Sequence, residues 1–284
     1  MARTSAKTQR RRGRPSKSGA PLLNTEKIVS AALDMTRAEE GKPLTFRALG
    51  AHLGVDPSAL YRYIPSKDGL LLMVADGIIQ EALENFNETG DWREDLHNLL
   101  GKVHRAYLEH PQVALSAVTR VTRLPAEMEF TEIMLRVLEA SGVQASKAVL
   151  AYRALEDTML AWTGFRANVL LMKDAEAEMQ DWEEVCLSAD TEQYPRVAAQ
   201  ATPMTAISLD EGFEASMELL LDGIQVQATS SSLQSHCTAI RASPNEMLEP
   251  GAAHRPGRSG VTGDIPAAVS KHSRYCCMQA LIKL

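Results

Sequence analysis

One stretch decides the fold that the sequence predicts: TFRALGAHLGVDPSALYRYIPSK, residues 45–67. It contains two short helical patterns joined by a tight turn. Thr45 can cap the first helix, because its hydroxyl can accept an N–H that the first turn leaves unpaired. Gly54 stands at the end of that helix, where the left-handed conformation costs glycine little. Asp56 and Pro57 can open the second helix, as a capping carboxylate and a proline at a position that needs no N–H. The stretch therefore predicts a helix-turn-helix.

The second helix of this stretch has a buried side and an exposed side. Leu60 and Ile64 are four residues apart, so they face inward together. Ser58, Ala59 and Arg62 then point outward and form a small, mostly uncharged surface. An ordinary pair of core helices is the alternative, but the caps, the turn glycine and the lysine that follows all fall in helix-turn-helix register.

The same residues resemble the DNA-binding domain of the TetR (tetracycline-repressor-like) family of bacterial regulators. The resemblance is specific over about residues 25–85 and extends to about residue 228 only by the spacing of helices. One departure is Ile64-Pro65, where the family often has Phe. The matching positions are Leu44-Thr45, Leu49, Gly54-Val55, Leu60-Tyr61, Tyr63, Lys67-Asp68 and Leu70-Leu71.

The resemblance implies an all-α protein. An N-terminal three-helix helix-turn-helix domain would be linked by a fourth helix to a larger helical domain for ligand binding and dimerisation. Together with the lack of hydrophobic periodicity at both ends, this predicts four segments in the chain. They are a disordered basic arm at 1–23, the DNA-binding domain at 24–70, the ligand-binding and dimerisation domain at 71–228, and a disordered tail at 229–284.

In a domain of this kind the second helix of the motif enters the major groove of DNA, where base edges carry a distinguishable pattern of donors and acceptors. The guanidinium groups of Arg47 and Arg62 suit guanine. Tyr61 and Tyr63 have an alternative role as partly buried packing residues. The resemblance points to Arg47, Pro57, Ser58, Ala59 and Arg62 near base edges, and to Thr45, Tyr61, Tyr63 and Lys67 at phosphates.

Basic residues are concentrated near the N-terminus. The chain carries a formal net charge of -6, yet residues 1–70 hold 13 Lys or Arg against six Asp or Glu. This end can attract phosphates while the acidic remainder repels them. Within the arm, Arg12-Gly13-Arg14-Pro15 resembles the core of an AT-hook, in which Arg12 and Arg14 would enter the narrow minor groove of A·T-rich DNA. A basic tail that binds phosphate without sequence preference is the alternative.

Several classes of protein are disfavoured by what the sequence lacks. No apolar run reaches the roughly 18–20 residues of a membrane span, and no apolar segment follows the basic N-terminus as in a signal peptide. No phosphate-binding glycine loop, nucleophile elbow or HExxH-type spacing indicates an enzyme, and we expect no cofactor and no metal. A cytoplasmic protein is expected, because the four cysteines fit no zinc spacing and suit a reducing compartment. These are Cys186, Cys237, Cys276 and Cys277.

Helical periodicity continues from Asp91 to about Ala228. Before it, we expect a first helix at about 25–40 and a fourth that ends near residue 86. Within it, we expect a short helix to end near Leu124-Pro125, and an exposed acidic segment to lead into a loop around Tyr194-Pro195.

Two long apolar helices close the periodic part of the chain. One carries apolar residues from Val149 to Val169, and the other carries them from Phe213 to Ile224 at steps of four, three and four. We expect these helices to pair with their copies across a two-fold axis and form a four-helix bundle. Packing within a single chain is the alternative.

A small-molecule pocket in the larger domain is implied by the resemblance. His104 and Arg166 are the informative candidates, because polar groups on mainly apolar faces need partners and a ligand can be one. Packing in the core is the alternative for all of the candidates. They are His104, Tyr107, Met134, Tyr152, Met159, Trp162, Phe165 and Arg166.

Together these features predict a sequence-specific, DNA-binding transcriptional regulator. In particular, we expect a repressor that binds a near-palindromic double-stranded operator as a homodimer and responds to an unidentified small-molecule effector. A transcriptional activator of the same fold needs the same contacts. A nonspecific architectural DNA-binding protein would instead rely on the basic arm.

Overall fold

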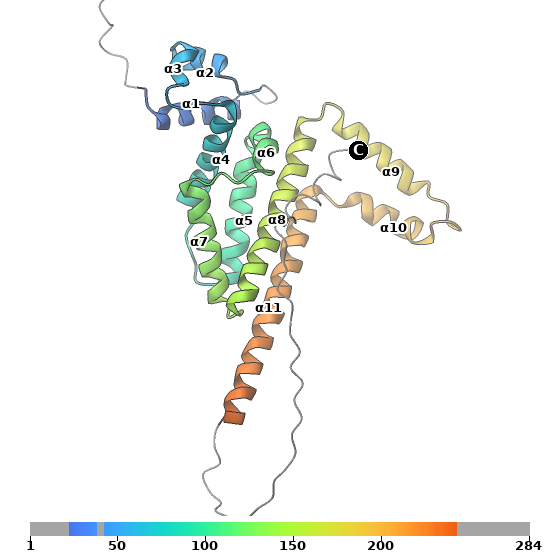
Figure 1. Ribbon diagram of the computed structural model, residues 1–284. Coiled ribbons are helices and arrows are strands. Elements are labelled where there is room, and N and C mark those ends of the chain that lie inside the picture. The colour runs from blue at the N-terminus through green and yellow to red at the C-terminus, as the bar shows by residue number, and fades with distance from the viewer. Residues whose placement is uncertain (1–22, 39–42, 243–284) are drawn as a thin grey trace, which may run out of the picture. The chain divides into compact units, whose positions relative to one another are not determined.

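The computed structural model describes residues 23–38 and 43–242 (Figure 1). All regular structure within them is α-helical, which confirms the predicted fold class. The predictions for the arm, including Arg12 and Arg14, and for residues 243–284 lie outside the described residues. The helices are α1 (Thr25–Ala38), α2 (Phe46–Leu53), α3 (Pro57–Leu60), α4 (Lys67–Glu84), α5 (Trp92–Leu108), α6 (Pro111–Ala117), α7 (Pro125–Ala140), α8 (Ala145–Leu171), α9 (Ala175–Leu187), α10 (Pro195–Ala206) and α11 (Leu209–Ala242).

The helix-turn-helix forms at the predicted residues. Thr45 caps α2, because its hydroxyl oxygen accepts a hydrogen bond from the Ala48 N–H at 3.1 Å. Gly54 follows α2 with a φ of 67°, the left-handed conformation that glycine adopts without strain. Asp56 caps α3 by accepting the Ser58 N–H at 2.8 Å. Local interactions within the stretch therefore set both ends of the turn.

A small apolar core holds α1, α2 and α3 together. Ile28 of α1, Leu49 of α2 and Leu60 of α3 are fully buried. Ile64, just after α3, is also fully buried, so the predicted inward pair of Leu60 and Ile64 is confirmed. Burial of each such side chain contributes about 1.5–3 kcal/mol, and this energy fixes α3 against its neighbours.

One helix, α4, joins the apolar core of the helix-turn-helix to that of the larger helical group, and the two form one continuous cluster. Ser66 caps it by accepting the Gly69 N–H at 3.0 Å. Along its length, Leu70, Val74 and Ile78 are fully buried. The helix packs against α1 and also against α5, α6 and α7, and Figure 1 shows it leading from the helix-turn-helix into the larger helical group. A displacement of α4 would therefore affect both groups of helices.

The larger core lies between α5, α7 and α8, beside α4 and α6. Its fully buried residues include Leu96, Leu99, Met134, Leu138 and Leu155. These come from the stripes that helical spacing predicted for this part of the chain. None of the helices in the described part of the chain has the length and apolar character needed to cross a membrane.

The last helix, α11, is longer than the sequence predicted. It runs from Leu209 to Ala242, so the predicted domain end at 228 is too early for this helix, and residues 229–242 are not part of an unstructured tail. The three serines at 230–232 had suggested that the helix ends before them. However, no glycine or proline interrupts the chain between Ile224 and Pro244, and serine is only modestly unfavourable in a helix.

Two other helix boundaries differ from the prediction. α6 ends at Ala117, so the helix that was expected to reach Leu124-Pro125 is shorter and a loop follows it. The expected loop before Pro195 is present at residues 188–194, but it is followed by a further helix of 12 residues, α10, which begins at Pro195 and packs against α9. The sequence did not reveal α10, because this segment lacks a continuous apolar stripe and contains Pro203, a residue that usually breaks a helix.

Candidate nucleic-acid interface and effector domain

The residues predicted to meet base edges lie around α2 and α3. Arg47, Ser58 and Arg62 are exposed, whereas Pro57 and Ala59 are half-buried at the start of α3. The surface therefore offers two long cations and one hydroxyl around small apolar groups. This combination suits a major groove, where a guanidinium can bind guanine and small residues let the helix approach closely.

The turn after α3 extends this surface. The N–H groups of Tyr63 and Ile64 donate to the Leu60 carbonyl at 2.9 and 3.0 Å, so the chain keeps turning beyond the four residues of α3. Tyr61 stacks on Phe46 of α2 with ring centroids 4.3 Å apart, yet 53% of Tyr61 is exposed. The ring of Tyr61 is therefore held by packing while much of the residue faces outward, which is compatible with both of its predicted roles.

The residues predicted to bind phosphate surround the same surface. Tyr63 and Lys67 are exposed, and Lys67 is the first residue of α4. Thr45 is half-buried and its oxygen accepts the cap hydrogen bond, but its O–H can still donate. Hydrogen bonds from Ser58 hold the pKa of Asp56 below its ordinary value, so this carboxylate is ionised at neutral pH.

A buried contact joins α1 to the start of α6. Thr36 Oγ1 lies 2.7 Å from His110 Nδ1, and both residues are buried. The Thr36 hydroxyl also lies 2.9 and 3.0 Å from the carbonyl oxygens of Ala32 and Leu33, so its hydrogen points to them and His110 Nδ1–H is the donor. Burial lowers the pKa of His110 to about 4, and its buried Nε2 has no hydrogen-bond partner among the described residues. The contact between α1 of the DNA-binding domain and the start of α6 is therefore made by a neutral His110 imidazole.

The carboxylate of Asp76, on α4, caps α7. The residue before α7, Leu124, has no side chain that can accept a hydrogen bond. Asp76 instead accepts the N–H groups of Glu127 at 3.1 Å and Ala126 at 3.3 Å, and the Thr122 hydroxyl lies 3.1 Å from the same carboxylate. The first N–H groups of a helix have no partner within it, so Asp76 satisfies two of them from another helix.

The loop between α6 and α7 is also tied to α4. Arg120 lies 3.2 Å from Asp68 at the start of α4, an exposed ion pair of small energy. Arg123 has a φ of 60°, which is unfavourable for a residue with a side chain, and its N–H donates to Glu127 at 2.8 Å. The loop thus adopts a strained conformation that its contacts hold in place.

A second neutral imidazole lies where α5, α8 and α11 meet. His104 Nδ1 is 2.8 Å from Thr163 Oγ1, and the Thr163 hydroxyl donates to the Met159 carbonyl at 2.7 Å, so His104 Nδ1–H is the donor. The ring of His104 stacks on Phe213 with centroids 4.1 Å apart. Burial lowers the pKa of His104 to about 4.

We expect the protein to lose stability as the pH falls from about 6.5 to about 4. Over this range the unfolded chain binds protons at His104 and His110 that the folded chain does not, because the folded pKa values are near 4. Thermal unfolding midpoints recorded from neutral pH downward test this. A variant with both histidines changed to glutamine should show a shallower decline, and an unchanged decline would contradict the assignment.

The predicted pocket residues lie at different depths. Tyr107, Met134 and Met159 are buried in the core, whereas 50% of Phe165 is exposed on α8. The Tyr107 hydroxyl donates to the Ala75 carbonyl of α4 at 3.4 Å, and burial raises the pKa of Tyr107. These residues therefore do not all face one space, and Tyr107 contacts the helix that leads to the DNA-binding domain.

His104, Trp162 and Arg166 all face α11. Trp162 Nε1 donates to Ser216 Oγ at 3.1 Å. Arg166 Nε lies 3.4 Å from an Asp210 carboxylate oxygen, close enough for an ion pair but without the alignment of a hydrogen bond. This group of polar and aromatic side chains is the part of the predicted pocket that the fold brings together.

Tyr152 belongs to another contact, with α7. Its hydroxyl lies 3.4 Å from Thr131 Oγ1, and burial raises the pKa of Tyr152 to about 12. Thr163 was not among the predicted pocket residues, although a polar residue within the longest apolar face was a signal for it. Phe213 was not among them either, although it stacks on His104.

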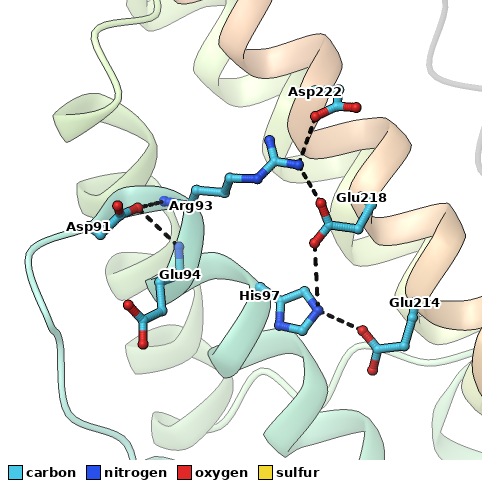
Figure 2. A network of polar contacts seen from close by, with 7 residues as sticks. All are labelled: Asp91, Arg93, Glu94, His97, Glu214, Glu218 and Asp222. Carbon is cyan, nitrogen blue, oxygen red and sulfur yellow. Dashed lines mark hydrogen bonds and ion pairs between the residues drawn. The ribbon is translucent and has the colours of Figure 1, made fainter.

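A row of charges ties α11 to α5 (Figure 2). Arg93 forms ion pairs with Glu218 and with Asp222, the latter at 2.7 Å. His97 Nε2 lies 2.6 Å from Glu214 and 3.9 Å from Glu218. The three acids are four residues apart on one side of α11, so α5 engages the charged side of this helix.

One apolar face of α8 and α11 is not covered by the described chain. Leu150 of α8 is 70% exposed, and Leu219 and Val226 of α11 are 73% and 66% exposed. A groove of about 280 Å³ lies between the two helices. These are the helices that were predicted to form the dimer, and large exposed aliphatic side chains that lie close together mark an interaction surface.

An exposed helix-turn-helix, joined by α4 to a larger helical domain, is the architecture of a helix-turn-helix transcriptional regulator. A family model described as the tetracyclin repressor-like C-terminal domain matches residues 86–228, half of the chain. The chain belongs to the TetR family, as its resemblance at the DNA-binding domain implied.

Named relatives and a solved structure agree with this family. An HTH-type transcriptional regulator of Saccharopolyspora erythraea is 28% identical over 140 residues, which are 49% of this chain and 59% of that protein. The HTH-type transcriptional repressor DrrR1 of Streptomyces coeruleorubidus is 26% identical over 75% of this chain and 81% of its own length. The structure of the Streptomyces coelicolor TetR family protein ActR in complex with actinorhodin matches 73% of this chain and 99% of ActR, at 24% identity and a TM-score of 0.64.

Proposed function

We propose that this protein is a ligand-responsive transcriptional repressor that binds a near-palindromic operator as a homodimer. The observation that carries the proposal is the capped helix-turn-helix, in which Leu60 and Ile64 anchor α3 while Arg47 and Arg62 stay exposed. Membership of the TetR family and similarity to the repressor DrrR1 support it. The protein acts by binding rather than by catalysis, on the chromosome in the cytoplasm.

In this proposal α3 enters the major groove of the operator. Pro57, Ser58 and Ala59 allow close approach, and Arg47 and Arg62 bind guanine edges. Phosphate contacts from both sides then set the position of the helix. These contacts come from Thr45, Tyr61, Tyr63 and Lys67, while Arg12 and Arg14 of the arm enter the adjacent minor groove.

Arg47→Ala and Lys67→Ala should weaken DNA binding in different ways. Loss of the Arg47 guanidinium should cost roughly 1–3 kcal/mol on the operator and much less on a random duplex. Lys67→Ala should weaken both duplexes alike, because phosphates carry no sequence information. Titrations of each variant against both duplexes measure the difference. Equal losses for Arg47→Ala on the two duplexes would remove it from the base-contacting set.

The homodimer would form through the uncovered face of α8 and α11. A two-fold axis through this face would present two copies of α3, separated by about one helical turn of DNA or somewhat more. The operator would then be near-palindromic. The exposed Leu150, Leu219 and Val226 support this assignment, because a second copy would remove them from water.

The effector would bind in the larger domain on the side where His104, Trp162 and Arg166 face α11. ActR, which shares the fold, binds actinorhodin, and in this chain the same domain would bind a small molecule. Its binding would favour a position of α4 that spreads the two copies of α3 and lowers operator affinity. The Thr36–His110 contact and the Asp76 cap would transmit that movement.

Sequencing of the chromosomal fragments that the purified protein retains tests the proposal. Enrichment of one near-palindromic sequence beside a promoter is the expected result. Retention of fragments without a shared sequence would indicate an architectural DNA-binding protein, and no retention at low salt would overturn the proposal. Deletion of the gene should raise transcription from the enriched promoter, whereas a fall would indicate an activator.

A further inference from the structure

Gly223 lies in the middle of α11, in a position where the fold of one subunit does not need glycine. A Cβ atom at Gly223 would meet no atom within 4 Å among the described residues. Glycine in a helix interior is unfavourable, because it has more conformational freedom to lose than any other residue. Another glycine of α11 is different: a Cβ atom at Gly212 would lie 2.6 Å from the ring of Trp162. Packing within the chain therefore explains Gly212 and leaves Gly223 unexplained.

The surroundings of Gly223 are apolar and exposed. Leu219 and Val226 lie one turn before and after it on the same face of α11, and they are 73% and 66% exposed. Leu150, on the α8 side of the groove, is 70% exposed. Glu214, Glu218 and Asp222 of α11 are turned toward Arg93 and His97 of α5, as Figure 2 shows, so they do not interrupt this face.

The shape of this surface would allow it to pack against a second copy of itself. The leucine side chains at 150 and 219 project from it, and the missing side chain at Gly223 leaves a depression in the same groove. In an isologous interface the same surface of each copy meets across a two-fold axis, so Gly223 at a crossing point would face Gly223 of the second copy, and Leu219 of each helix would lie one turn away over the groove of the other. The distance between two packed helices depends on the side chains at their contact, so glycine permits the closest approach.

We propose that a second copy of this chain covers the face and that the two α11 helices cross at Gly223, with Leu219 of each subunit in the groove of the other. This proposal rests on the homodimer of the proposed function and adds the point of contact. A larger side chain at position 223 then has opposite consequences in the two states. It is accommodated in a single subunit, where the space is open, and it separates the helices of the dimer.

The test is sedimentation equilibrium of the full chain and of three variants. Gly223→Leu should raise the dimer dissociation constant by at least about tenfold, since overpacking of a contact is costly, and Gly223→Ala should raise it by a smaller factor. Gln225→Leu is the matched control: Gln225 is exposed and two residues further along, on the opposite side of α11. This control should change the constant by less than about twofold.

Circular dichroism separates loss of the dimer from loss of the fold. The helical content of Gly223→Leu should match that of the wild type. If Gly223→Leu loses helical content, the dimer dissociation constant of Gly223→Ala, measured by sedimentation equilibrium, tests the proposal instead. Dimerisation of both Gly223 variants as tight as in the wild type would overturn the proposal, as would a monomeric wild type. The two proposals can fail separately. If Gly223→Leu weakens the dimer but the protein retains no chromosomal fragment, the proposed function is overturned and the contact at Gly223 stands.

Discussion

Replacement of Leu60 by alanine should lower the free energy of unfolding by about 2–5 kcal/mol. Leu60 is fully buried where α3 meets the rest of its domain. α3 has only four residues, so its own hydrogen bonds cannot hold it in place, and its position depends on this anchor. Operator binding should be lost together with stability. Urea unfolding followed by circular dichroism measures the first effect, and a titration with the operator measures the second.

Arg62→Ala is the matched control for Leu60→Ala, two residues away. Arg62 is exposed, so its loss should leave the free energy of unfolding within about 0.5 kcal/mol of the wild type. It should nevertheless weaken operator binding by about 1–3 kcal/mol. If Arg62→Ala lost as much stability as Leu60→Ala, or if Leu60→Ala unfolded like the wild type, the description of α3 as an anchored recognition helix would be wrong.

The second large effect is expected for Asp76→Ala, which should lower the free energy of unfolding by about 2–4 kcal/mol. Its carboxylate accepts two N–H groups at the start of α7, and alanine would leave both without a partner. Hydrogen exchange should show lost protection at Ala126 and Glu127. Asp76→Asn should lose less, because one oxygen remains to accept.

Asp68→Ala is the control for Asp76→Ala, because it also removes a carboxylate from α4 but not the cap of α7. Asp68 pairs with Arg120 at an exposed site, so its removal should cost no more than about 1 kcal/mol. If both aspartate variants lost the same stability, the cap by Asp76 would not be what joins α4 to α7. If only Asp76→Ala loosens α7, this contact is placed to carry movement between the effector domain and α4.

The helix-turn-helix was predictable because its determinants are local. The caps by Thr45 and Asp56 and the left-handed Gly54 depend on residues within a few positions of each other, and all three formed as expected. The anchor residues Leu60 and Ile64 followed from spacing on one helix face. Such features appear directly in a sequence because no distant part of the chain is needed to produce them.

The contacts between domains were not predictable, because they depend on residues far apart in the sequence. Nothing near Thr36 indicates that its hydroxyl meets His110, and nothing near Asp76 indicates that it caps α7. The interior of the larger domain was predictable in part. His104 was correctly expected to need a partner, but the sequence could not show that Thr163 provides it.

The predicted helix boundaries were wrong where some residues favour the end of a helix and others favour its continuation. The serines after Thr229 suggested that the last helix ends there. No glycine or proline follows them before Pro244, and α11 continues to Ala242. α10 contains Pro203, which disfavours a helix interior because proline cannot donate a hydrogen bond, yet the helix continues to Ala206. The apolar stripe of α11 was found from the sequence, but its division into a face buried in the chain and a face left uncovered required the fold.

The most direct test of the central claim is selection of duplexes from a random pool by the purified full chain, followed by the mass of the complex with the selected duplex. We predict one near-palindromic sequence, bound by an even number of subunits, and no such enrichment for the Arg47→Ala, Arg62→Ala double variant. A pool that stays random after selection at low salt, with no complex of defined mass, would contradict it.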